Sequence, residues 1–134
     1  MTPLQKDLLD GLLREVEAAV AAGETLVVFD LDDTLFSTTN RHLRILREYA
    51  ERLESRDPAS AGIVRAIDRE RLRYAITDTV KDAGLQESLV KDLKDFWFAR
   101  FFKNPYLLED DAIAGGAAYC REVVQRGARA IYMT

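Results

Sequence analysis

The chain has 134 residues, of which 48% are hydrophobic, and its 19 basic and 23 acidic side chains give a net charge of −4. This length suits one domain, or one domain with an insertion, and the apolar content is sufficient for a buried core. The acidic balance argues against nucleic acid and anionic membranes as partners, the single cysteine excludes a disulfide framework or a cysteine-based zinc site within the chain, and no apolar run approaches the ~20 residues of a membrane span.

A helix is predicted over residues 3–22, with Thr2 as its cap, Pro3 in its first turn and Gly23 as its stop. Apolar residues recur at helical spacing along one face of this segment. Its acidic, amphipathic pattern is not that of a signal peptide, so a cytoplasmic protein is the expectation.

A strand is predicted over residues 25–30, because the apolar run Leu26–Phe29 ends abruptly in the polar residues Asp30, Asp32 and Thr34. Such a run is typical of a strand buried on both faces of a parallel sheet. Open α/β sheets bind ligands at the carboxyl ends of their strands. Carboxylates there need a compensating ion, partner or solvent, so the segment is a candidate functional site.

Helical patterns fill the next part of the chain, from about residue 37 to 104. One helix follows the cap-type residues 37–40, a second runs from Asp57-Pro58 to near Gly84, and a third spans about 86–102 before Asn104-Pro105 breaks it. A further helix is predicted over 112–126 and a second buried strand over 128–134. This order predicts a parallel strand pair whose right-handed crossover carries a long helical insertion.

The pair Asp30 and Asp32 suits phosphoryl transfer. Residues two apart on an extended chain point the same way, so both carboxylates are expected to face one site. One acid is then a nucleophile that forms an acyl-phosphate, and the other protonates the leaving group and later activates water. Mg²⁺ prefers such oxygen ligands and would offset their charge, and the Thr34 hydroxyl would hold the loop. The alternative is a strand-end turn in which the acids only cap a helix.

The segment Val27–Leu35 resembles the first motif of the haloacid dehalogenase superfamily of phosphohydrolases, a hydrophobic strand followed by Asp-x-Asp-x-Thr. The resemblance implies that Asp30 is the nucleophile and Asp32 the general acid/base. It also implies that Mg²⁺ binds to the Asp30 side chain and the Asp32 backbone carbonyl. The segment Ala130–Thr134 is similar to the family's second motif, which implies that Thr134 holds the phosphoryl group.

The resemblance further implies an α/β fold with a Rossmann-like parallel sheet, here of about two strands, and an inserted all-helical cap. Residues 1–36 and 105–134 are then the two parts of the core, and residues 37–104 are the cap. The family's third-motif Lys or Arg and fourth-motif acidic pair belong to later strands. We therefore expect an N-terminal portion of a longer protein, or one completed by another chain, with little phosphatase activity by itself. The expected substrate is a small phosphorylated metabolite.

Two other functions remain open. Dehalogenase or phosphonatase chemistry of the same superfamily is disfavoured by Asp32, because a carboxylate acid/base suits an oxygen leaving group. A non-catalytic phosphate- or metal-binding module, or a regulatory domain, is favoured by the later motifs that the chain lacks and disfavoured by the presence of both acids. The oligomeric state is open too, since an exposed sheet edge recruits another chain or further strands.

Other residues have plainer interpretations. His42 is expected at the solvated surface, and Arg41 and Arg44 on an exposed charged helix face, with contact to a substrate anion as the alternative. The run Glu109–Asp111 is interpreted as a helix start signal. The remaining expectations concern packing: a cap core for Phe96, Trp97, Phe101 and Phe102, close packing of the crossover helix at Gly115-Gly116, and a small core residue at Cys120.

Overall fold

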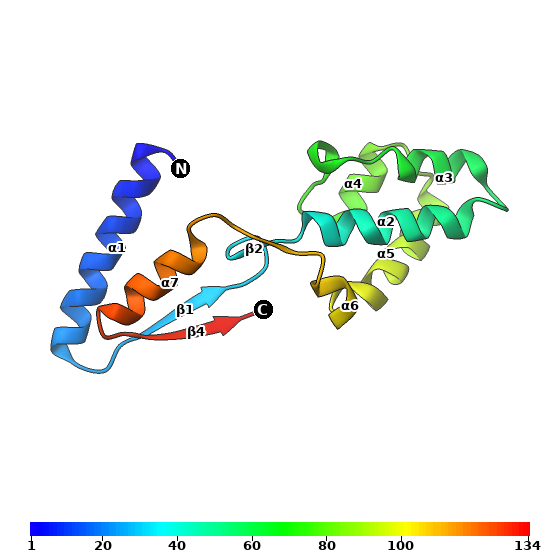
Figure 1. Ribbon diagram of the computed structural model, residues 1–134. Helices are drawn as coiled ribbons and strands as arrows, with labels where there is room; N and C mark the ends of the chain where they lie inside the picture. The colour runs from blue at the N-terminus through cyan, green and yellow to red at the C-terminus, as the bar shows by residue number, and fades with distance from the viewer. The chain divides into compact units, whose positions relative to one another are not determined.

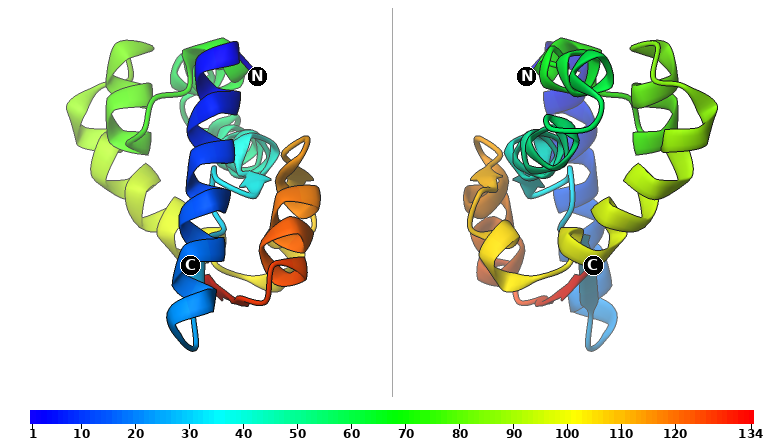
Figure 2. Two further views of the ribbon diagram at one scale, coloured as in Figure 1. Left: turned by 90° about the vertical axis from the view of Figure 1, so that its left-hand side faces the viewer. Right: turned by 90° about the vertical axis from the view of Figure 1, so that its right-hand side faces the viewer.

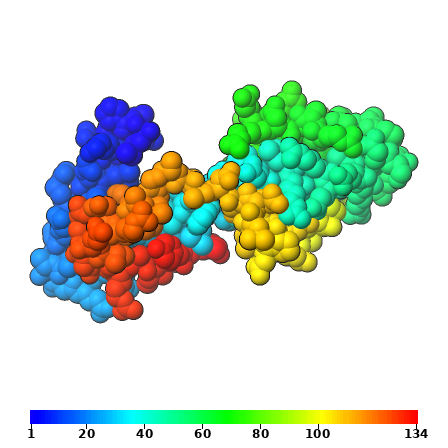
Figure 3. All heavy atoms as spheres, viewed as in Figure 1, coloured from blue at the N-terminus to red at the C-terminus, as the bar shows by residue number.

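A computed structural model describes residues 1–134 and divides them into two compact units (Figure 1). The first unit comprises Met1–Ser37 and Ala112–Thr134, and the second comprises Thr38–Asp111. In Figure 3 the beginning and the end of the chain, blue and orange to red, are packed together in the first unit. The fold is mixed α/β, mostly helical, with a small two-stranded parallel sheet.

The first unit contains two long helices and the parallel sheet. Its elements are α1 (Pro3–Ala22), β1 (Leu26–Asp30), β2 (Phe36–Ser37), α7 (Gly116–Gln125) and β4 (Arg129–Met133). The helix predicted over 3–22 is confirmed, and Thr2 and Gln5 form a capping box at its start. Helices α1 and α7 lie side by side (Figure 2). The short strand β3 (Asp111–Ala112) pairs with β2.

The parallel pairing of β1 with β4 is confirmed, with Leu26 opposite Arg129 and Asp30 opposite Met133. The expectation that both strands are buried is wrong. Phe29 is buried, whereas Leu26 and Val28 are 53% and 55% exposed. The helices of this unit pack against the face that carries Phe29 and leave the alternate side chains uncovered.

The core of the first unit therefore lies on one face of the sheet. It consists of Leu13, Phe29, Cys120, Val123 and Ala128. The burial of Cys120 agrees with the small core residue expected at this position.

The second unit is entirely helical. Its elements are α2 (Thr39–Leu53), α3 (Pro58–Arg65), the 3₁₀ turn η1 (Arg69–Arg71), α4 (Ile76–Asp82), α5 (Glu87–Phe101) and α6 (Asn104–Leu107). Its core is formed mainly by apolar side chains of α2, α3, α4 and α5. None of the helices of the chain has both the length and the apolar character that a membrane span requires.

Two predicted helices differ from those observed. The single helix expected between residues 57 and 84 is split into α3 and α4, because side chains satisfy backbone groups of the segment that separates the two helices. Asp68 accepts a hydrogen bond from the Arg71 N–H, and the Thr79 hydroxyl accepts one from the Arg73 N–H. Pro105, expected as a breaker, lies in the first turn of α6, where its missing N–H costs nothing.

Candidate functional site

The loop after β1 is a tight turn centred on one carbonyl group. The Leu31 carbonyl oxygen accepts hydrogen bonds from the N–H groups of Thr34, Leu35 and Phe36, at 3.3, 3.0 and 3.0 Å. Asp33 has a φ of +57°, in the left-handed region that Asp and Asn enter more readily than other non-glycine residues. The loop backbone is thus closed on itself, which fixes the positions from which its side chains extend.

Asp30 lies at the carboxyl end of β1 and is exposed. Its Oδ2 accepts a hydrogen bond of 3.0 Å from the Thr34 hydroxyl. No hydrogen bond joins Oδ1 to another group of the chain. The side chain is therefore held through one oxygen while the other is available to an incoming ligand.

Asp32 lies just beyond the strand and is half-buried, and it forms an isolated bridge with Phe36. Both Asp32 and Asp33 have further interactions with other groups of the chain. Asp32 is thus an integrated part of the loop, in contrast to the exposed carboxylate of Asp30.

Thr134 follows β4 at the same edge of the sheet. The Asp30–Met133 pair is the last of the parallel ladder, and the Leu31 N–H donates to the Met133 carbonyl oxygen at 2.9 Å. Thr134 is the next residue after this pair and is exposed. The parallel register therefore brings the two carboxyl strand ends, with Asp30 and Thr134, to one edge of the sheet.

The structure contains no group of three or more His, Cys, Asp or Glu side chains placed to hold a metal ion. The Mg²⁺ ligands that the resemblance implies are different, since they are one carboxylate oxygen, from Asp30, and one backbone carbonyl, from Asp32. The exposed carboxylate of Asp30 fits that set, because Mg²⁺ takes oxygen ligands and is often bound through one or two carboxylates.

Segment 109–111 has a role that the sequence did not reveal. It was expected to start a helix, but the next helix begins only at Gly116. Instead, each of its three acids contacts α2: Asp110 forms a bidentate pair with Arg41, Glu109 bonds Arg44 at 2.8 Å, and Asp111 bonds Asn40 at 2.9 Å. We call these contacts the α2 clasp.

The α2 clasp corrects two expectations. Arg41 is not on an exposed face: its side chain is 1% exposed, its guanidinium lies 4.3 Å from the centre of the Phe101 ring, and it also donates to the Phe101 carbonyl oxygen. Arg44 is partly exposed and also donates to the Pro105 carbonyl oxygen at 2.9 Å. These bonds join segment 109–111 to α2 within the helical unit, which comprises Thr38–Asp111.

His42 is likewise not a solvated surface residue. Its ring stacks on Trp97 at 5.7 Å with an interplanar angle of 9°, and the Trp97 Nε1–H donates to His42 Nδ1 at 3.0 Å. These contacts tie the His42 ring to α5 and away from open solvent.

The aromatic residues of α5 and of its C-cap, Phe102, divide between core and surface. Phe96 and Phe101 are buried as expected, whereas Phe102 is 56% exposed.

Elsewhere in the helical unit, burial and a 2.9 Å hydrogen bond to Asp92 raise the pKa of Tyr49 above its ordinary value.

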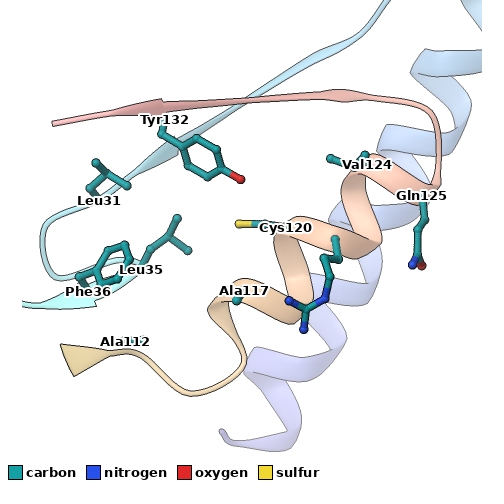
Figure 4. A pocket seen from close by; sticks show the side chains of 10 residues that line it. Leu31, Leu35, Phe36, Ala112, Ala117, Cys120, Val124, Gln125 and Tyr132 are labelled. Carbon is teal, nitrogen blue, oxygen red and sulfur yellow. The ribbon is translucent and has the colours of Figure 1, made fainter.

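A groove of about 790 Å³ lies beside the candidate loop in the first unit (Figure 4). Leu31, Leu35 and Phe36 of the loop form one part of its wall, and Cys120 and Tyr132 point into it from α7 and β4. Its lining is predominantly apolar, so it is distinct in character from the carboxylate edge at Asp30.

Comparison of the chain with protein-family models, with curated proteins and with solved structures found no match.

Proposed function

We propose that the chain carries the first two motifs of a Mg²⁺-dependent phosphohydrolase of the haloacid dehalogenase superfamily, with a Rossmann-like core and a helical cap. The observation that carries the proposal is the register of the parallel pair, in which Asp30 and Thr134 stand at the same edge of the sheet. The hydrogen bond from Thr34 to Asp30 supports it further, because it orients the carboxylate and leaves Oδ1 available.

In the proposed first step, Asp30 Oδ1 attacks the phosphorus of a phosphate monoester, and the bond between phosphorus and the leaving oxygen breaks. Asp32, in its acid form, donates a proton to that oxygen, so that an alcohol leaves and an aspartyl-phosphate remains. The Thr134 hydroxyl donates a hydrogen bond to a phosphoryl oxygen.

In the second step, the Asp32 carboxylate takes a proton from water, whose oxygen attacks the phosphorus. The acyl-phosphate bond breaks, Asp30 is regenerated, and inorganic phosphate leaves. Asp30 and the Asp32 carbonyl would hold Mg²⁺, which offsets the negative charge that carboxylates and phosphate bring together. A small phosphorylated metabolite is the proposed substrate.

The proposal is tested with beryllofluoride, which mimics a phosphoryl group on a carboxylate. We expect the chain to bind beryllofluoride in the presence of Mg²⁺, as followed by ¹⁹F NMR, and to release it when EDTA removes the metal. Asp30→Asn should abolish binding, since the amide is a far weaker nucleophile and metal ligand.

Asp33→Asn is the matched control, because Asn tolerates the left-handed backbone at this position and the change removes the same charge. It should retain binding. Equal binding by Asp30→Asn and wild type would refute Asp30 as the nucleophile. The alternative, a phosphate- or metal-binding module without catalysis, predicts the same binding but no turnover in any form of the protein.

A further inference from the structure

The groove beside α7 has the features of a helix-binding site. One wall is the α7 face that carries Ala117, Val124 and Gln125, and Tyr132 of β4 lies opposite (Figure 4). Arg121 of α7 also lines the groove. Val124 and Tyr132 are 52% and 53% exposed. Apolar grooves of this kind accept the apolar face of an amphipathic helix through residues spaced three or four apart.

Helix α1 exposes a stripe with that spacing. Leu4, Leu8 and Leu12 follow one another at intervals of four residues and are 79%, 64% and 42% exposed. Residues four apart lie on one face of a helix. The other apolar face of α1, which includes Leu13, is buried within its own unit. The helix is therefore apolar on two faces, of which only one is covered.

The stripe and the α7 wall have the same length. Leu4 and Leu12 are eight residues apart, as are Ala117 and Gln125, and eight helical residues rise about 12 Å. The charges also match: Asp7 flanks the centre of the stripe, Arg121 stands at the centre of the wall, and neither side chain takes part in a hydrogen bond or ion pair of the chain.

The chain's own α1 cannot fill this groove. The Tyr119 hydroxyl donates to the Leu9 carbonyl oxygen at 3.1 Å, and Arg126 forms an ion pair with Glu17 at 2.9 Å. These contacts hold α1 on a side of α7 that does not line the groove. Its exposed stripe is thus available only to another molecule.

We propose that the groove receives helix α1 of a second copy of this chain and that the protein forms a homodimer. The leucine stripe of one copy packs against the α7 wall of the other, with Leu8 near its centre, and Asp7 pairs with Arg121 across the interface. The contact covers apolar surface on both elements and pairs two charged side chains that form no hydrogen bond or ion pair within the chain.

The test is the oligomeric state, measured by light scattering after size exclusion and by sedimentation over a range of concentrations. We expect a discrete dimer. Leu8→Asp should give a monomer with unchanged helix content, because Leu8 is exposed within its own unit. Tyr74→Asp is the matched control, since Tyr74 is fully exposed in the helical unit, and it should leave the dimer intact.

Charge reversal then tests the pairing. Arg121→Glu and Asp7→Lys, each alone, should raise the dimer dissociation constant at least about tenfold, and the double variant should restore it. Lys94→Glu, the same change on an exposed residue of α5, should have no effect. A monomer at every concentration overturns the proposal. So does a dimer, or a series of larger species, that neither Leu8→Asp nor the charge reversals alter.

Discussion

At the scale of the residue, the two arginines at the start of α2 show how burial changes the role of a charged side chain. Arg41 and Arg44 are three positions apart, yet Arg41 is buried and Arg44 is partly exposed. A buried guanidinium is tolerated only when its hydrogen bonds are satisfied, and Asp110 and the Phe101 carbonyl oxygen do this for Arg41. Arg41 therefore has a structural role that no pattern in α2 indicates.

Arg41→Met is expected to destabilise the helical unit by about 3–5 kcal/mol, because it leaves the buried Asp110 carboxylate without its partner. Urea unfolding followed by the fluorescence of Trp97, the one tryptophan of the chain, measures this change directly. The control is Arg65→Met, which breaks the exposed pair with Glu54 and should cost less than about 1 kcal/mol. Equal losses for the two variants would contradict a stabilising role of the α2 clasp.

At the scale of the element, the start of α7 depends on two glycines with different structural roles. Gly115 precedes the helix with a φ of +86°, in the left-handed region that favours glycine. A Cβ on Gly116 would stand 3.1 Å from Leu35 Cδ2, closer than ordinary packing allows. The close packing expected at this pair thus holds for Gly116, and the turn requires Gly115. Together they bring α7 against the loop that carries Thr34.

Gly115→Ala should lower the free energy of unfolding by about 1–2 kcal/mol, because the alanine Cβ is strained at positive φ. Denaturation followed by circular dichroism measures the loss. Gly62→Ala is the control: Gly62 lies within α3, no atom stands within 4 Å of its added Cβ, and the change should stabilise by about 0.5–1 kcal/mol. Opposite signs for the two substitutions are the expected result, and a loss at both positions would contradict this account of Gly115.

At the scale of the whole molecule, the two units differ in how completely they bury their apolar residues. The helical unit has a core of fifteen buried residues, whereas the core of the first unit has five. Its two-stranded sheet keeps one face open, with Val28, Ile131 and Met133 at least 40% exposed. The proposed chemistry belongs to this less complete unit, in which Asp30 and Thr134 stand at one edge of the sheet.

The chain by itself should hydrolyse 4-nitrophenyl phosphate at a rate close to that of the buffer, with or without Mg²⁺. The reason is that the proposed function assigns Asp30, Asp32 and Thr134 within residues 1–134, whereas the proposed family also uses a basic residue and a second acidic pair on later strands. The matched variant is Asp30→Asn, which should leave this low rate unchanged. Turnover that is appreciable and is lost in Asp30→Asn would contradict the prediction.

Much of this organisation could be predicted from local patterns. The helix at 3–22 follows from its cap, its apolar spacing and Gly23, and the parallel strands follow from two apolar runs separated by helices. The candidate residues at the end of β1 could be found because Asp30, Asp32 and Thr34 are close in the sequence. The helix, the two separate strands and the loop share one property, which is that residues within a few positions of one another determine each of them. The parallel direction of the strand pair follows instead from the general rule for crossover connections.

The tertiary structure alone decided which charges and faces are buried. The sequence placed Arg41 on a helix and Asp110 in a turn, but their pairing joins positions 69 residues apart, and no local pattern encodes it. In the same way, the apolar run of β1 indicated a buried strand, yet the packing of α1 and α7 covers only one of its faces. Secondary structure and candidate chemistry depend on neighbours in the chain, whereas burial and pairing depend on which distant elements come into contact.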